Sequence, residues 1–134
     1  MRSEFLVACA LAVSTPACVI DADPDPSVVV SRATLVVDWT IQGIADPDLC
    51  RLTDAEVLSV VVTTLSGRFV GEFQQSCTAF AAAIDLRPGS YLADIVLLDA
   101  FGYELTTPVL IDPFTLLAGD QLFLSIDFPA RSFY

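Results

Sequence analysis

The 134-residue chain contains no histidine and no lysine, and its six basic side chains are all arginine. Without histidine it cannot build a Ser-His-Asp or Cys-His nucleophilic site, a His-ligated zinc site or the usual general base near neutral pH. Its 17 acidic side chains give a formal net charge of −11. Such a surface disfavours DNA and RNA, whose binding depends on arrays of Lys and Arg, so we predict no nucleic-acid partner.

The N-terminal region also lacks an apolar run long enough to span a membrane. Residues 5–13 are nine apolar residues, whereas a transmembrane helix needs about 20. Their number fits the apolar region of a secretory signal, and they lie between Arg2 and the small residues 14–17. We therefore predict that residues 1–17 are a signal peptide and that the protein is exported.

A small residue and a cysteine, Ala17-Cys18, follow this segment, and residues 21–27 are acidic and rich in proline. This junction resembles that of bacterial lipoproteins, in which the cysteine is diacylated and becomes the mature N-terminus. The resemblance implies a lipid on Cys18, membrane attachment through that anchor and a flexible acidic tether over residues 18–30. Because Val19 rather than Asp follows the cysteine, lipoprotein sorting would favour the outer membrane. The alternative is a secreted protein cleaved after Ala17.

From residue 31 onward the apolar residues recur with a period of two, which is typical of half-buried strands. The pattern predicts seven strands, at about residues 35–41, 57–64, 68–75, 80–86, 91–97, 103–111 and 122–128. Pro108 predicts an edge position for part of the sixth strand. No stretch shows a convincing amphipathic helical repeat, and residues 46–48 indicate a loop.

Seven short strands in about 100 residues predict one all-β domain over residues 31–134, a seven-stranded antiparallel β-sandwich. The segments Leu86-Arg87-Pro88-Gly89-Ser90-Tyr91 and Leu97-Leu98-Asp99-Ala100-Phe101-Gly102 carry a distinctive pattern. It resembles the L-x-P-G-x-Y … L-x-D-x-x-G pattern of bacterial immunoglobulin-like and transthyretin-like sandwich domains. The resemblance implies one of these two folds, with Tyr91 first among the core-facing residues of its strand. The whole chain is similar to small secreted lipoproteins of GC-rich Gram-negative bacteria.

The chain has four cysteines, Cys9, Cys18, Cys50 and Cys77. If Cys9 leaves with the signal peptide and Cys18 carries lipid, an even pair remains, and export makes a disulfide its expected state. The predicted turn at residues 66–67 would place Glu56 opposite Ser76. Cys50 and Cys77 would then both lie at the open end of that hairpin, which favours their pairing.

The carboxylates do not indicate a catalytic set. Asp38, Asp85, Asp94 and Asp127 lie on strand faces opposite the apolar residues, so we expect them to face solvent. We therefore predict no enzyme activity, no cofactor and no metal. Calcium at the loop acids Asp46, Asp48 and Asp99 or Asp120 is an alternative to simple solvation.

The function that remains is a non-catalytic cell-envelope module that acts through protein–protein contacts, with an envelope protein or a second copy as partner. We expect the contacts at residues 46–50, at the turn 100–103 and at the tail 128–134. Aromatic residues and arginine are typical interface anchors, so the candidate interface residues are Phe128, Arg131, Phe133 and Tyr134. The alternative for the tail is a last strand packed on its own core. The alternatives are a calcium- or carbohydrate-binding sandwich domain and, least favoured, a small hydrolase.

The apolar content of 54% is higher than the predicted signal peptide and core explain. Val36, Val57, Val61, Leu98 and Phe123 fall on the faces that the alternation assigns to solvent. Either loops cover these faces, or the strand registers slip, or an exposed apolar patch binds a partner.

Overall fold

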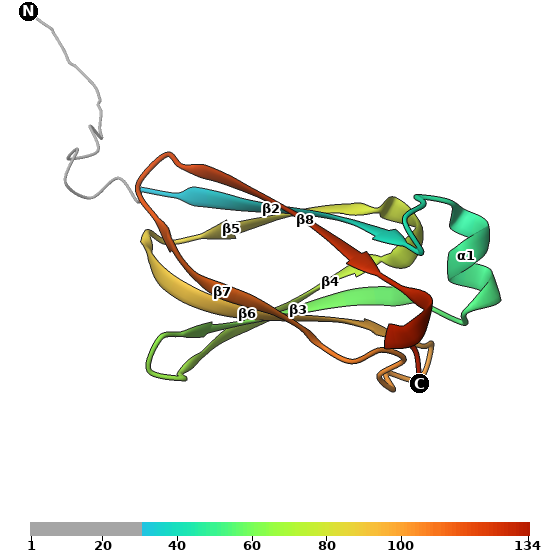
Figure 1. The fold of residues 1–134 in the computed structure, drawn as a ribbon. Coiled ribbons are helices and arrows are strands. Elements are labelled where there is room, and N and C mark those ends of the chain that lie inside the picture. The colour runs from blue at the N-terminus through green and yellow to red at the C-terminus, as the bar shows by residue number, and fades with distance from the viewer. Residues whose placement is uncertain (1–30) are drawn as a thin grey trace, which may run out of the picture. The chain divides into compact units, whose positions relative to one another are not determined.

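The computed structural model describes residues 31–134, so the predicted signal peptide, Cys18 and the tether lie outside the described residues. The described part is an all-β sandwich of two sheets (Figure 1). Its strands are β2 (Ala33–Ile41), β3 (Val57–Thr64), β4 (Phe69–Ser76), β5 (Ala81–Leu86), β6 (Gly89–Leu98), β7 (Val109–Leu116) and β8 (Gln121–Phe128). The other elements are the helix α1 (Pro47–Leu52) and two 3-10 turns, η1 (Cys77–Ala79) and η2 (Ala130–Ser132).

The strands are ordered β5-β2-β8 in one sheet and β4-β3-β6-β7 in the other. The prediction of an entirely antiparallel sandwich is wrong at one pair, because β2 and β8 are parallel. Each strand reverses the direction of the one before it, so the first and the seventh strand point the same way. The three-stranded sheet places these two strands side by side, and they therefore pair in parallel, whereas the other pairs are antiparallel.

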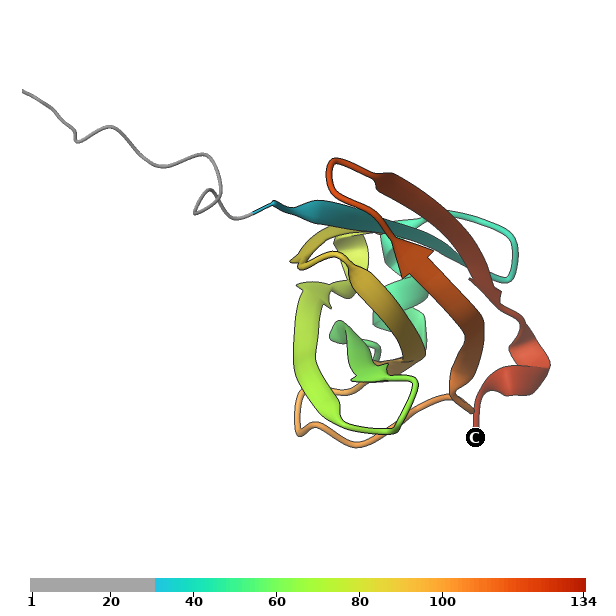
Figure 2. The same ribbon diagram turned by 90° about the vertical axis from the view of Figure 1, so that its left-hand side faces the viewer.

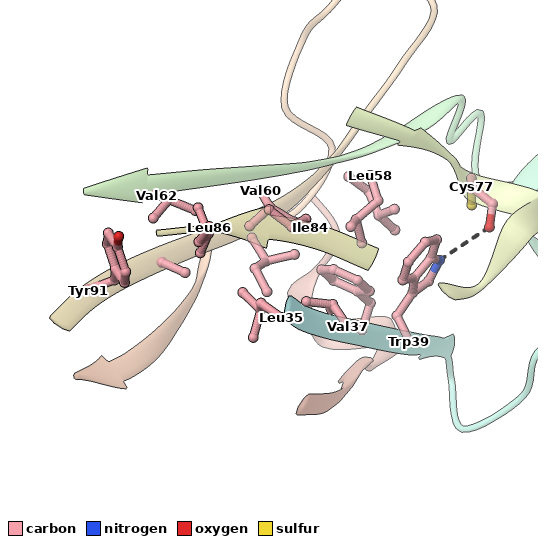
Figure 3. Close-up of a cluster of buried hydrophobic side chains, with 14 of the residues drawn as sticks. Leu35, Val37, Trp39, Leu58, Val60, Val62, Cys77, Ile84, Leu86 and Tyr91 are labelled. Carbon is pink, nitrogen blue, oxygen red and sulfur yellow. Dashed lines mark hydrogen bonds between the residues drawn. The ribbon is translucent and has the colours of Figure 1, made fainter. Parts of the chain in front are cut away.

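The core lies between the sheets and follows the predicted alternation. Along β2, buried residues alternate strictly with half-buried ones, and Leu35, Val37, Trp39 and Ile41 face inward. Figure 3 shows how side chains of β2, β3 and β5 meet in this layer. Tyr91 is the first buried residue of β6, as the resemblance implied.

One predicted strand boundary is wrong. The sixth strand begins at Val109, after Pro108, and not near residue 103. Residues 104–107 instead make single bridges, Glu104 to Leu98 and Thr106 to Phe133. The sixth strand is β7. It lies at the edge of its sheet, where it accommodates Pro113 beside a shift of register.

The hairpin of β3 and β4 also differs from the expected register. Val57, not Glu56, is opposite Ser76, because the register shifts between Val62 and Thr63. An irregularity of this kind adds one residue to one strand, and alternation alone does not reveal where it occurs. The Glu56 carbonyl oxygen instead accepts a hydrogen bond from the Cys77 N–H (2.9 Å).

The apolar residues assigned to the outer faces do lie there, so the faces of these strands were predicted correctly. Val36, Val57 and Val61 are half-buried, and Leu98 is buried beside its bridge to Glu104. Phe123 is 63% exposed, on the outer face of the three-stranded sheet. No helix within residues 31–134 is both long enough and apolar enough to cross a membrane.

The connections gather at the two ends of the sandwich (Figure 1). The N-terminal end of the sandwich comprises residues 31–32 and the turns 65–68, 87–88 and 117–120, and Figure 2 faces it. The loop end comprises residues 42–56, 77–80, 99–108 and 129–134.

Candidate functional site

The three segments predicted to form the working surface all lie at the loop end, and backbone hydrogen bonds join them to the sandwich. The Glu56 N–H, just after α1, donates to the Leu98 carbonyl oxygen (2.8 Å), just before the 99–103 turn. The Tyr134 N–H donates to the Leu105 carbonyl oxygen (3.0 Å), which holds the tail beside the same connection. These hydrogen bonds hold the connections of the loop end beside one another.

A disulfide joins Cys50 of α1 to Cys77 of η1, which confirms the predicted pairing. Both residues are buried, and their Cα atoms are 6.0 Å apart. The indole Nε1–H of Trp39 donates to the Cys77 carbonyl oxygen (3.2 Å), as the dashed line in Figure 3 shows. The disulfide thus links the β2–β3 connection to the β4–β5 connection at the loop end.

The 99–103 turn has a fixed shape because its first carboxylate binds its own backbone. Asp99 Oδ1 accepts hydrogen bonds from the N–H groups of Phe101 and Tyr103, both at 2.9 Å. Gly102 has a φ of 87°, a conformation that glycine adopts at little cost. The Asp and Gly of the L-x-D-x-x-G pattern therefore build a turn that holds Phe101, 86% exposed, and Tyr103 out in solvent.

The helix α1 was not predicted, because residues 46–48 were interpreted as a loop. Asp46 is its N-cap and accepts a hydrogen bond from the Asp48 N–H (2.9 Å), and Pro47 opens the first turn. Asp48 also pairs with Arg51 at 3.1 Å. The helix presents an exposed Leu52 on the loop end, and Ile44 is exposed just before it.

A pocket of about 490 Å³ lies between α1 and the 99–103 turn. It is lined by Cys50, Arg51, Asp54, Ala55, Glu56, Asp99, Ala100 and Phe101. One cationic and three acidic side chains surround it, and the exposed ring of Phe101 forms part of its rim. The pocket can therefore hold a polar group while Phe101 contacts an apolar one.

The four candidate interface residues of the tail are divided by the fold. Phe128 is fully buried in the core, so it is not available to a partner. Phe133 is half-buried and packs against the core, whereas Arg131 and Tyr134 are exposed, the latter by 79%. In the tail, Phe128 and Phe133 therefore pack on the domain, whereas Arg131 and Tyr134 lie on its surface.

The loop acids proposed for calcium are engaged separately. Asp46 caps α1, Asp99 holds its turn, and Asp120 at the opposite end accepts a hydrogen bond from the Leu117 N–H (2.7 Å). Within residues 31–134, no three carboxylate or cysteine side chains come together as metal ligands. These acids do not share a site.

The strand carboxylates lie on outer faces, as expected from the alternation. Asp85, Asp94 and Asp127 are exposed and Asp38 is half-buried. Asp127 Oδ1 accepts hydrogen bonds from the Thr40 hydroxyl and the Gly43 N–H, both at 2.7 Å. Asp85 Oδ1 accepts one from the Thr34 hydroxyl (3.2 Å), so both groups stabilise neighbouring strands.

A scan against protein-family models finds no match for this chain, and a search of the curated proteins finds no significant relative.

Proposed function

We propose that this protein is a non-catalytic module of the bacterial cell envelope that binds a protein partner through the loop end. One observation carries the proposal: large exposed apolar side chains gather there from separate segments. They are Ile44, Leu52, Phe101, Tyr103 and Tyr134. Large exposed apolar side chains at one end of a domain favour a binding surface there, and aromatic residues are frequent interface anchors.

The charges at the loop end indicate the chemistry of the partner. Exposed carboxylates lie in the same connections as the apolar side chains, among them Asp48, Asp54, Glu56 and Glu104. Complementary charge favours encounter and suppresses wrong partners. The expected partner surface is therefore an apolar depression with a basic rim.

The proposed location of the module in the cell rests on the sequence of residues 1–30. The lipoprotein-like junction supports acylation of Cys18 and attachment to the outer membrane, with the acidic segment as a tether. Residue 31 enters the domain at the end opposite the loop end. An anchored domain can therefore present the loop end away from the membrane.

Strand pairing supports the transthyretin-like type over the immunoglobulin-like one. In immunoglobulin constant domains the first strand shares a sheet with the second, fifth and fourth strands. Here the first strand, β2, lies between the fourth, β5, and the last, β8. Of the two types, we therefore propose the transthyretin-like one.

The binding surface can be tested by photocrosslinking in living cells. A crosslinking amino acid in place of Phe101 or Tyr103 should capture the same envelope protein, or a second copy of this chain. The matched control is Phe123, an exposed aromatic residue on a sheet face, which should capture nothing comparable. Equal capture from Phe123, or none from the loop end, would contradict the proposal, as would turnover of an ester, glycoside or peptide by the pure protein.

Acylation needs a separate test. Metabolic labelling with a palmitate analogue should mark the wild-type protein and the Cys9→Ser variant, but not Cys18→Ser. Both substitutions change one cysteine of the N-terminal segment, so the comparison isolates the lipidated position. Equal labelling of the two variants would show that Cys18 is not the anchor.

The pocket favours a carbohydrate ligand as a second candidate function. Asp54 and Glu56 can accept hydrogen bonds from sugar hydroxyl groups while the Phe101 ring contacts a sugar face. Calorimetric titration with envelope polysaccharide fragments would detect such binding, and Phe101→Ala should abolish it. Binding that survives this substitution would place any carbohydrate elsewhere.

A further inference from the structure

We infer that the N-terminal end of the sandwich docks on an anionic lipid surface. The inference rests on the proposed location in the envelope, but the docking does not require acylation of Cys18. It follows from three features of this end: its arginines, its exposed apolar side chains and its position at the start of the domain.

Three arginines from three separate segments lie at this end. They are Arg32, Arg68 and Arg87, and all three are exposed. Each backbone is held: the Arg32, Arg68 and Arg87 carbonyl oxygens accept hydrogen bonds from the Gly119 N–H (2.8 Å), the Thr64 N–H (2.8 Å) and the Tyr91 hydroxyl (2.6 Å). Their positions are therefore set by the fold, while the guanidinium groups extend into solvent. Guanidinium groups are well suited to lipid phosphates because their donors match phosphate oxygens.

Apolar side chains accompany these arginines. Leu65 and Phe69 flank the turn that carries Arg68, and Leu117 opens the turn that is hydrogen-bonded to Arg32. All three are exposed, Phe69 and Leu117 by 64% each. Arginine next to exposed Leu and Phe is the composition of surfaces that lie in the headgroup region of a bilayer.

The arginines outnumber the carboxylates near this end. Asp85 and Asp120 lie close to it and keep their negative charge, although each accepts a hydrogen bond from within the domain, so the three arginines exceed them by one. The acids of the loop end are separated from it by the length of the strands. Ten-residue β6 spans about 33 Å at roughly 3.3 Å per residue, about four Debye lengths at physiological salt. The membrane field therefore acts on the arginines much more strongly than on the acids of the loop end.

The position of this end of the sandwich, where the chain enters the domain, favours a lipid surface as its binding partner. Residue 31 enters the domain here, after at most 12 residues from Val19 to Val30, which reach no more than about 40 Å when extended. An anchor at Cys18 would keep the arginines within that distance of the headgroups. The effective concentration of lipid at this end is then high, so weak contacts suffice.

Vesicle flotation of the purified full-length Cys18→Ser chain tests the inference without a lipid anchor. The protein should float with vesicles of phosphatidylglycerol and phosphatidylcholine in equal amounts more than with phosphatidylcholine alone. In this background the pair Arg68→Gln and Arg87→Gln should lower the partition coefficient on anionic vesicles roughly 30-fold, from about 1 kcal/mol per basic residue. The matched control, Arg51→Gln with Arg131→Gln, removes the same charge from the loop end and should leave partitioning nearly unchanged.

Two further readouts complete the test. Raising the salt concentration should weaken the binding of the parent chain to anionic vesicles, whereas Leu117→Ser should weaken it at every salt concentration. Binding through residues 5–13 would be common to all variants and would not distinguish the two arginine pairs. Equal losses from both pairs, or equal binding to both kinds of vesicle, would overturn the inference. Failure of acylation at Cys18 would not, because this experiment uses the unacylated chain.

Discussion

The Tyr91 hydroxyl donates a 2.6 Å hydrogen bond to the Arg87 carbonyl oxygen from a side chain that is only 7% exposed. The bond crosses the Pro88-Gly89 turn and so ties β6 to the end of β5. This contact is one physical reason for the tyrosine in the L-x-P-G-x-Y pattern. The bond is partly buried, and removal of one partner from such a hydrogen bond leaves the other as an incompletely satisfied polar group.

Tyr91→Phe should therefore lower the free energy of unfolding by about 1–2 kcal/mol, because it leaves the ring in place and removes only the donor. The matched control is Tyr103→Phe, at an exposed ring whose hydroxyl is free to bond with water. That change should alter stability by less than about 0.5 kcal/mol. Urea denaturation followed by Trp39 fluorescence would measure both, and equal losses would contradict the role assigned to Tyr91.

The disulfide between Cys50 and Cys77 closes a loop with a sequence separation of 27. Replacing both cysteines, Cys50→Ala with Cys77→Ala, should cost about 3–4 kcal/mol on the chain-entropy model. A reductant should destabilise the wild-type domain by a similar amount and leave the double variant unchanged. A reductant effect on the double variant would show that another group is responsible.

At the residue scale, the number of cysteines, the predicted export and the predicted hairpin together indicated the disulfide, and alternation predicted the buried residues of β2. The prediction that Phe128 is an interface residue was wrong, because the residue is fully buried. It continues the inward set Leu122, Leu124 and Ile126 of β8, so the alternation already placed it in the core. Its aromatic character and its position near the chain end gave a competing indication, and burial decided against it.

At the element scale, α1 was missed because six residues are too few to show a helical period. Its signal was local: a capping Asp followed by Pro. The sixth strand was predicted too early because its apolar alternation began before Pro108, whose missing N–H and fixed φ interrupt a ladder. Local backbone chemistry thus overrode periodicity in both places.

The cap of α1 gives the element-scale prediction. Asp46→Ala should lower stability by about 1 kcal/mol, since it removes the acceptor for the Asp48 N–H, whereas Asp46→Asn should keep most of it. Because α1 carries Leu52 and lines the pocket, Asp46→Ala should also weaken any loop-end binding. Thermal melts of the two variants beside the wild type would check the cap. A loss with Asn as large as that with Ala would contradict it.

At the scale of the whole molecule, alternation predicted seven strands and their faces but not their order. Alternation fixes which face of each strand is buried, but many strand orders are compatible with the same set of buried faces. The parallel contact of β2 and β8 joins residues almost 90 positions apart, such as Thr34 and Gln121, and no local signal specifies it. Successive strands run in opposite directions, so alternate connections lie at the same end of the sandwich. The sequence therefore predicted only in part that the three loop segments meet at one end.

Charge is distributed unevenly over the domain. Glu56 and Glu104 both border Leu98 at the loop end, the first through a hydrogen bond and the second through a bridge, and both carboxylates are exposed. Asp54 and Asp99 lie nearby, together with Glu56 in the lining of the pocket. Like charges this concentrated destabilise the folded state, and salt screens the effect.

Glu56→Gln with Glu104→Gln should therefore raise the melting temperature at about 0.01 M salt, where the Debye length is roughly 30 Å, and much less at about 1 M, where it is roughly 3 Å. The matched control, Asp94→Asn with Asp112→Asn, removes two exposed carboxylates away from the loop end and should have a smaller salt-dependent effect. Thermal melts across that range of salt would compare the pairs. If both pairs stabilise equally at low salt, net charge alone accounts for the effect and the acids of the loop end do not act as a cluster.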